Sequence, residues 1–258
     1  MKFFLGTHVT SWLGRLSIPL FISRRRLTTA KLHKALGSWA LDSGGFSELS
    51  MYGEWTTEPE EYVDDVRRFS ANVGNLEWAA IQDWMCEPQM LAKTGLNIVE
   101  HQRRTVLNYN TLLHLAPEIA WTPVLQGWEQ ADYKAHVTMY EAEGHILRNL
   151  PVLGIGSVCR RQHLEEIAIF LEELKADGFN NLHGFGFKTT GLMTLKQFAM
   201  SRRNAKTDLA LASADSMSWS FTARYEDPLP GCNTHINCAN CIKYAMMWYN
   251  NLQRNLEA

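Results

Sequence analysis

The feature that most constrains the fold of this chain is a regular alternation of short apolar runs with longer amphipathic segments along most of its 258 residues. Short apolar runs are typical of buried strands, and longer segments with a 3.6-residue period are typical of helices. Strands that alternate with helices favour a parallel sheet. The eight expected strands are Phe3–Thr7, Ile18–Ile22, Trp39–Asp42, Glu77–Gln82, Trp121–Gln126, Val152–Gly156, Leu182–Phe187 and Ala210–Ala214.

The segments between these runs contain clear helical patterns. Leu96–Leu115 reads as a long helix, closed by Pro117. Eight strands with intervening helices predict an α/β fold of the (β/α)8 TIM-barrel type, which accommodates about 250 residues in one unit. An open doubly wound sheet is the alternative, but no Gly-x-Gly-x-x-Gly follows the first strand. Apolar side chains at helical spacing are Tyr62, Val66, Phe69 and Val73 in one segment and Leu164, Ile167, Leu171 and Leu174 in another.

Composition bounds the possible partners. Lys plus Arg is 25 and Asp plus Glu is 27, giving a net charge of −2, so the chain lacks the bulk basicity of a histone-like binder. Any nucleic-acid contact must then come from local clusters. Such clusters are Arg24-Arg25-Arg26, Arg103-Arg104, Arg160-Arg161 and Arg202-Arg203. We expect no membrane contact, because no stretch approaches 18 apolar residues.

Polar residues and glycines gather where the expected strands end, which is where a barrel carries its chemistry. Asp42 closes the third strand, and Gly44 and Gly45 would let the backbone turn sharply and a ligand approach closely. Each such residue alone is compatible with a cap or a turn. Together, on consecutive strands, they indicate a site. Later strands end with Asp83, Gln126, Gly154 to Gly156, His183 to Gly186, and Asp215.

This set of residues suits chemistry at a glycosidic bond. Two carboxylates from different strands can divide one displacement, one attacking the anomeric carbon and the other moving a proton at the leaving group. An Asp and a Gln can hydrogen-bond the edge of a purine, and glycines leave backbone groups bare for the same purpose. The sequence therefore favours glycosidic chemistry on a nucleobase.

Three of the five cysteines lie between residues 232 and 241. With His235 they form a set at spacings of three, which is typical of a closed structural zinc site. A redox pair, Cys238 and Cys241, is the alternative, although no thioredoxin-like context surrounds it. The odd count and clustering suit a reducing compartment, so we expect a cytoplasmic protein.

We expect a barrel over residues 1–230 and a zinc-binding appendage over 231–258, whose helix Ile242–Leu252 packs on the barrel. The expected ligands are Cys232, His235, Cys238 and Cys241.

The ordered motifs resemble those of the tRNA-guanine transglycosylase superfamily. The similarity runs from Leu41-Asp42-Ser43-Gly44-Gly45-Phe46 through Asp83 with Cys86-Glu87-Pro88, Gln126-Gly127, Gly154 to Gly156, Gly184-Phe185-Gly186 and Asp215 to the metal cluster. It is closest to the DpdA-type enzymes, which exchange guanine in DNA for a 7-deazaguanine. Segments similar to that branch in particular are Thr7-His8, Ser23 to Arg26, Ala79 to Pro88, Glu100 to Arg104 and Gly156 to Arg161.

The resemblance implies a role for each matching position. Asp215 would be the nucleophile that forms a covalent glycosyl-enzyme, and Asp42 the general acid/base. The base would be read by Asp83, Gln126, Gly127, Gly154 and Gly156, in a pocket bordered by Phe46 and His183. DNA phosphates would be held by Arg24, Arg25, Arg26, Arg160 and Arg161.

Several alternatives stay open at this stage. The same exchange on tRNA is one, and a catalytically inactive barrel that binds nucleic acid is another, which the intact Asp42 and Asp215 argue against. A zinc-dependent hydrolase is a third, but most histidines fall in expected helices or loops; His8 is expected to be structural or pocket-lining.

The superfamily usually has Cys-x-Cys-x-x-Cys and a later His ligand. No His follows Cys241 here, so either His235 serves or the site has three protein ligands. A homodimer and accessory modification proteins are also possible partners.

Overall fold

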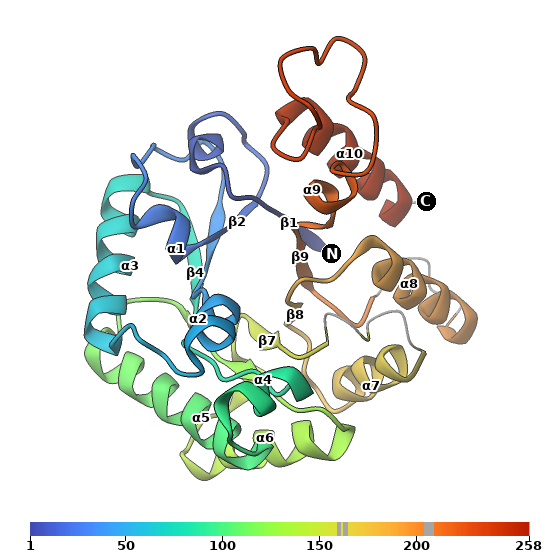
Figure 1. Cartoon of the computed structure of the whole chain (residues 1–258). Coiled ribbons are helices and arrows are strands. Elements are labelled where there is room, and N and C mark those ends of the chain that lie inside the picture. Colours follow the sequence, from blue (N-terminus) through green and yellow to red (C-terminus); the bar gives the residue numbers. More distant parts are fainter. Residues whose placement is uncertain (159–160, 162–164, 204–208, 258) are drawn as a thin grey trace.

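The computed structural model describes residues 1–158, 161, 165–203 and 209–257. Within these ranges nine strands, all paired in parallel, form a nearly closed barrel (Figure 1). Their order around the barrel is β5-β4-β3-β2-β1-β9-β8-β7-β6. The predicted α/β barrel is therefore confirmed. The strands are β1 (Lys2–Gly6), β2 (Leu20–Ser23), β3 (Trp39–Asp42), β4 (Leu76–Ala80), β5 (Trp121–Thr122), β6 (Val124–Leu125), β7 (Leu153–Ile155), β8 (Leu182–Gly184) and β9 (Ser213–Ser216).

The predicted strand over 121–126 is wrong in one respect, because it consists of two short strands, β5 and β6. Pro123 stands between them and has no N–H to donate to a strand ladder. β5 pairs with β4 and β6 pairs with β7, while the Pro123 carbonyl still accepts a 2.9 Å hydrogen bond from the Gly154 N–H. β5 and β6, the first and last strands in the order around the barrel, are thus joined by Pro123 alone. The last strand also lies later than the expected 210–214, because β1 pairs with Ser213 to Ser216.

Helices surround the strands on the outside (Figure 1). The predicted helices correspond to α3 (Pro59–Val73), α5 (Ile98–Leu115) and α7 (Glu165–Ala176). Among the described residues, none of the helices has both the length and the apolar character that crossing a bilayer requires. The helices are α1 (Arg24–Leu27), α2 (Gly45–Tyr52), α3 (Pro59–Val73), α4 (Pro88–Thr94), α5 (Ile98–Leu115), α6 (Gln130–Ala142), α7 (Glu165–Ala176), α8 (Thr189–Arg203), α9 (Ser218–Thr222) and α10 (Ile242–Glu257), with 3-10 turns η1 (Thr10–Gly14) and η2 (Leu147–Asn149).

Aromatic side chains fill the inside of the barrel. Phe4, Phe21 and Trp78, from β1, β2 and β4, form a buried cluster there. All three rings contact the imidazole of His183, and the closest, Trp78, has its centroid 4.8 Å away. A barrel interior filled in this way is a packed core. It forms a floor beneath the carboxyl ends of the strands.

The carboxyl-terminal helix α10 packs on the barrel. Tyr244, Tyr249 and Leu252 are buried in the core cluster that includes β1 and α8. Phe3 of β1 meets the rings of Trp248 and Tyr249 at 5.8 and 6.2 Å. The helix continues to Glu257, beyond the expected end at Leu252.

Candidate active site

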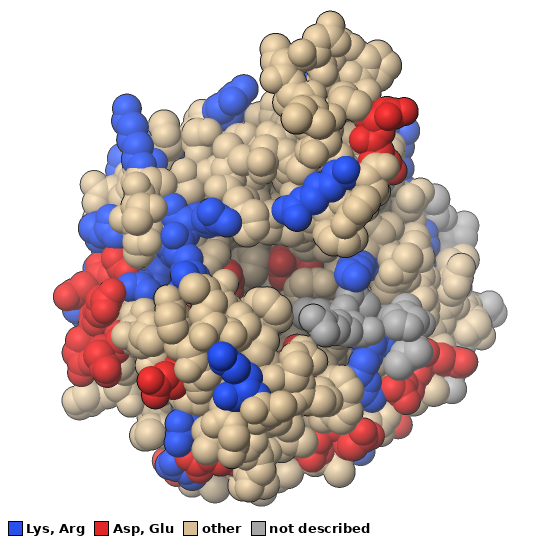
Figure 2. Space-filling model, viewed as in Figure 1, with Lys and Arg blue, Asp and Glu red and all other residues tan. Residues whose placement is uncertain are grey.

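A cavity of about 280 Å³ opens at the carboxyl ends of the strands. Figure 2 shows the hollow in the middle of this face, with acidic atoms inside it and basic side chains around it. Its lining includes three aspartates from well-separated parts of the chain: Asp42 at the end of β3, Asp83 after β4 and Asp215 in β9. Gln126, Gly156 and Phe46 line it as well, and Phe46 is 54% exposed. The barrel thus brings six of the nine predicted catalytic and base-binding residues together.

Asp42 is held by the turn that its glycines permit. Gly44 has φ 89°, a left-handed conformation that favours glycine, and its N–H donates to Asp42 Oδ1 at 3.2 Å. Burial raises the pKa of Asp42, and the charge of Asp215 raises it further, while hydrogen bonds from Gly44 and Ser23 oppose the shift. A carboxyl with a raised pKa retains its proton at higher pH, as a general acid must.

Asp215 is oriented from two sides and is only 5% exposed. Its Oδ1 accepts a hydrogen bond from the Gly186 N–H at 2.9 Å and lies 3.3 Å from His183 Nε2. The other imidazole nitrogen, Nδ1, lies 2.9 Å from Ser213 Oγ. His183 is therefore a buried support for the Asp215 carboxylate.

A chain of polar contacts connects the base-binding candidates. Gln126 Nε2 donates to Asp83 Oδ2, and Gln126 Oε1 lies 2.6 Å from the hydroxyl of Ser157. Desolvation raises the pKa of Asp83 to about 7, with the charge of Asp42 adding to the rise and the Gln126 hydrogen bond opposing it. A side chain near this pKa can present either a hydrogen-bond donor or an acceptor to a ligand.

Ser157 lines the cavity, although the sequence did not lead us to predict it as a site residue. It has φ 57°, an uncommon conformation for a residue other than glycine, which is found preferentially at functional sites. Its Oγ accepts the Cys86 N–H at 2.8 Å and lies 2.9 Å from Glu87 Oε2. Its position directly after Gly156 at a strand end was the available signal. Ser23, which ends β2 and also lines the cavity, likewise stood at a strand end.

Three predicted base-binding residues lie elsewhere. Within the part of the chain that the structure describes, the cavity lining does not include Gly127, Gly154 or His183. A Cβ at Gly154 would lie 2.3 Å from the Phe185 ring, and one at Gly127 would lie 2.8 Å from Asp132 Cβ. These two glycines thus permit close packing beside the site.

The prediction that Arg24 holds DNA phosphates is corrected by its burial. Arg24 is 6% exposed, and its guanidinium donates to Asp65 at 2.7 Å, to Glu61 at 2.5 Å and to Thr57 at 2.6 Å. These partners use the donors that a phosphate would need. Arg24 therefore fixes α1 against α3.

The other predicted phosphate ligands differ from one another. Arg25 is partly exposed and pairs with Glu48 at 2.6 Å. Arg26 is exposed and donates to His8 Nδ1 at 3.3 Å; His8 lines the cavity. Arg161 pairs with Glu166 at 2.8 Å and lies over the Trp128 ring. Arg160 lies outside the described residues.

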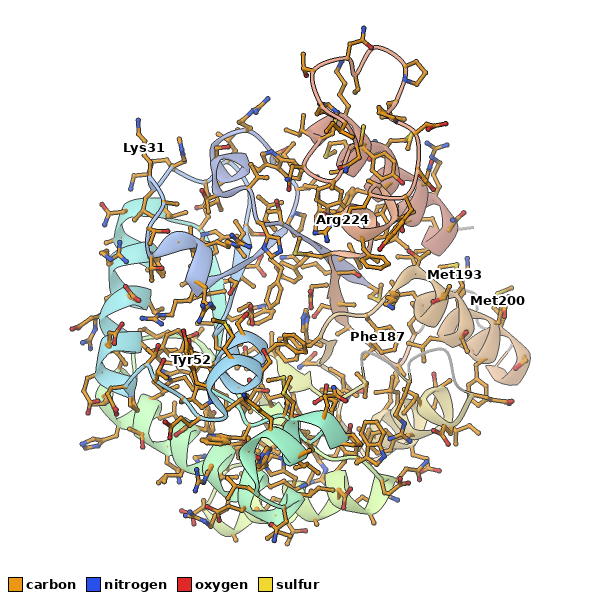
Figure 3. The ribbon with its side chains drawn as sticks, in the orientation of Figure 1. Lys31, Tyr52, Phe187, Met193, Met200 and Arg224 are labelled. Atoms are coloured by element: carbon orange, nitrogen blue, oxygen red, sulfur yellow. The ribbon has the colours of Figure 1, made fainter. Side chains whose placement is uncertain are left out.

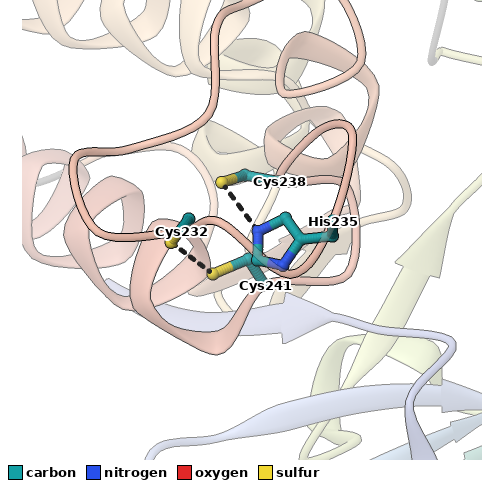
Figure 4. Close-up of side chains that lie close together, drawn as sticks. All are labelled: Cys232, His235, Cys238 and Cys241. Carbon is teal, nitrogen blue, oxygen red and sulfur yellow. Dashed lines mark hydrogen bonds between the residues drawn. The ribbon is translucent and has the colours of Figure 1, made fainter.

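The four predicted metal ligands come together in the loop before α10 (Figure 4). One ligand atom from each of Cys232, His235, Cys238 and Cys241 lies within 4.8 Å of the others. The Cys232 and Cys241 sulfurs are 3.7 Å apart, and His235 Nε2 is 3.3 Å from the Cys238 sulfur. A tetrahedron with metal–sulfur bonds of about 2.3 Å has sulfur–sulfur edges of about 3.8 Å. The cluster can hold a metal ion through four protein ligands.

The fold and the site place this protein among the α/β barrels that have a carboxylate-lined cavity at the carboxyl ends of their strands. Barrel enzymes carry their active sites at this position. Over residues 1–258 the chain matches the family described as DpdA, DeoxyPurine in DNA protein A, and it belongs to that family. The family implies a transglycosylase-type enzyme of DNA modification, with DNA as its substrate. A search of curated proteins gave no match.

Proposed function

We propose that the protein exchanges guanine in DNA for a 7-deazaguanine base, such as 7-cyano-7-deazaguanine, through a covalent intermediate on Asp215. The observation that carries the proposal is that Asp42 and Asp215 line one cavity in a chain that matches the DpdA family along its whole length. Two carboxylates on one sugar carbon are what a double displacement needs.

In the first displacement, a carboxylate oxygen of Asp215 attacks C1′ of the target nucleotide. The bond between C1′ and N9 breaks, and its electron pair leaves with guanine, which takes a proton from Asp42. The raised pKa of Asp42 favours this role, because a general acid has to hold its proton until the leaving group takes it. The product is a deoxyribosyl ester of Asp215.

In the second displacement, the ionised Asp42 takes a proton from N9 of the incoming 7-deazaguanine. N9 attacks C1′, and the ester bond to Asp215 breaks with its electron pair returning to the carboxylate. Two inversions retain the configuration at C1′. One glycosidic bond replaces another, so no ATP is required.

Base recognition is assigned to Asp83, Gln126 and the backbone at Gly156. Asp83 and Gln126 are linked to each other, and Gly156 has no side chain between its backbone and the Gln126 amide. Phe46, exposed at the cavity, offers a ring on which the base can stack. The target nucleotide has to leave the DNA stack to reach this cavity.

We assign zinc to the Cys232, His235, Cys238 and Cys241 cluster, as a structural ion. Soft thiolates with one imidazole in a closed set of four leave no coordination position for a catalytic water. The ion would stabilise the loop that leads into α10, next to the barrel.

Nucleoside analysis tests the proposal. DNA and tRNA from cells that express the protein, together with a supply of the 7-deazaguanine base, are digested and compared by mass spectrometry. We expect 7-deaza-2′-deoxyguanosine derivatives in DNA and none above background in tRNA. Cells expressing Asp215→Asn serve as the control. Modified nucleosides in tRNA alone would transfer the proposal to the tRNA reaction, and their absence from both would refute it.

A further inference from the structure

Helix α9, which follows the strand that bears Asp215, and the turn after α9 carry an exposed aromatic pair. Phe221 is 60% exposed and Tyr225 is 76% exposed, and their rings lie 5.2 Å apart at 58°. The side chains between the barrel and this pair are buried: Trp219 donates to the Gly6 carbonyl, and Ser220 to the Ala239 carbonyl. The aromatic pair is therefore on the solvent side of a firmly anchored helix.

This exposed pair is connected to the cavity through Met217. Met217, which precedes α9, lines the cavity, and its carbonyl accepts the Phe221 N–H at 3.4 Å. Arg224 and Tyr225 lie in the turn after α9, where the Arg224 N–H donates to the Phe221 carbonyl at 3.2 Å and the Tyr225 N–H to the Thr222 carbonyl at 3.0 Å. Phe221 is thus one helical turn from a residue that lines the cavity, and Arg224 and Tyr225 follow it directly.

Two arginines, Arg224 in the turn after α9 and Arg26 of α1, have no acidic partner among the described residues. Within residues 1–158, 161, 165–203 and 209–257, neither Arg26 nor Arg224 forms an ion pair, whereas Arg24, Arg25 and Arg161 each do. Both arginines influence His8, which lines the cavity. Arg26 donates a hydrogen bond to His8 Nδ1, and burial together with the charges of Arg26 and Arg224 lowers the pKa of His8. Figure 3 shows Arg224 near the central opening of the barrel.

We propose that the surface formed by Phe221 of α9 and by Arg224 and Tyr225 in the turn that follows binds the DNA strand beside the target guanine. A base next to the target stacks on the two rings, and Arg224 and Arg26 hold phosphates near His8. The inference rests on the proposed function, and it adds a strand-binding surface to the base pocket. Unpaired cations beside exposed aromatic rings are the combination that single-stranded nucleic acid selects.

The test measures binding of fluorescent single-stranded oligonucleotides that contain one guanine. In Phe221→Ala/Tyr225→Ala, we expect binding about tenfold weaker than wild type. An oligonucleotide with abasic sites on both sides of the guanine should bind wild type about tenfold more weakly, but should bind the double variant with no further loss. Met200→Ala, an exposed apolar residue of α8, is the control and should bind like wild type. If the abasic oligonucleotide binds the double variant about tenfold more weakly than the intact oligonucleotide does, the two losses of affinity are additive and the stacking contact is overturned.

Arg224→Gln tests the phosphate contact separately. The slope of log affinity against log salt should fall by about 0.7 for one lost contact on a single strand. Arg254→Gln is the matched control, because Arg254 is an exposed arginine in the last turn of α10, next to Asn255, whose carbonyl accepts a hydrogen bond from Lys196 of α8. Equal slopes for wild type and Arg224→Gln would overturn this part.

Two further measurements separate the possible failures. Guanine exchange by wild type on the same oligonucleotide is followed in parallel. If exchange proceeds and the α9 variants bind normally, only this inference fails; if wild type neither binds nor exchanges, the proposed function fails with it. If Phe221→Ala/Tyr225→Ala instead changes the sedimentation of the free protein, the face is a self-association surface and the inference is overturned.

Discussion

Asp42 and Asp215 line the same cavity from strands that are separated in the barrel by β2 and β1. The charge of Asp215 contributes to the raised pKa of Asp42, so the two carboxyl groups are also electrostatically coupled. A carboxyl with a raised pKa beside a second carboxyl is the arrangement that acid-assisted displacement at a sugar carbon uses.

The first prediction concerns Asp42. Asp42→Asn keeps the shape and removes the proton donor, so the exchange rate should fall by about 10²- to 10⁴-fold. The thermal midpoint should not fall, because the substitution removes a buried ionisable group. Rates come from release of radiolabelled guanine, with Asp64→Asn, an exposed position on α3, as control. A variant with more than a tenth of wild-type activity would assign the proton transfer to another group.

The second prediction concerns the pH dependence that Asp83 introduces. Its pKa is about 7 in the folded protein, against an ordinary value of 3.8. A raised carboxyl pKa contributes stability that is present below pH 3.8 and is lost as the pH rises toward 7, by up to about 1.4 kcal/mol per pH unit. Asp83→Asn should lose less stability over this range than wild type. Urea unfolding at pH 4, 5, 6 and 7 measures the difference; parallel curves would show that the Asp83 pKa is ordinary.

The third prediction concerns the close contact of Gly156 with Gln126. A Cβ at residue 156 would lie 2.1 Å from Gln126 Nε2. Gly156→Ala should therefore displace the Gln126 amide, lower stability by about 1 to 3 kcal/mol and raise the KM for the base. Adding Gln126→Ala should restore most of the stability but not the KM. If the double variant is no more stable than Gly156→Ala, the clash lies elsewhere.

The fourth prediction concerns the metal cluster. The purified protein should contain about one equivalent of zinc, and Cys238→Ser should lose metal and solubility, because a closed four-ligand site stabilises the fold. Removal of the ion with a chelator should lower the thermal midpoint of wild type. Elemental analysis measures the content, with Cys86→Ser, a buried cysteine outside the cluster, as control. Full metal content in Cys238→Ser would exclude Cys238 as a ligand.

Much of the barrel could be predicted because apolar runs and helical spacing are local signals. β3 has the predicted bounds Trp39–Asp42, and Asp42 and Asp83 reach one cavity because parallel strands end on the same side. The division of the fifth strand was harder to foresee, since Pro123 is tolerated only because neighbouring strands pair with its two sides separately. The division of the chain at residue 230 stays a prediction.

The arginines show where local sequence is insufficient. Three consecutive residues, Arg24 to Arg26, look alike in the sequence, yet Arg24 is buried on acids of α3 while Arg26 is exposed beside the cavity. The partners of Arg24 lie more than thirty residues away, so no local pattern distinguishes the three. His183 was similarly expected at the cavity, but the aromatic floor of the barrel holds it beneath Asp215.

The most direct test of the account is the mass of the protein after incubation with a guanine-containing oligonucleotide, without incoming base, and denaturing quench. We expect a species heavier by the oligonucleotide minus one guanine, with the modification mapping to the peptide that contains Asp215. The species should be absent from Asp215→Asn, whose thermal midpoint should remain close to that of wild type. An adduct that persists in Asp215→Asn, or that maps to Asp42, would contradict the assigned mechanism.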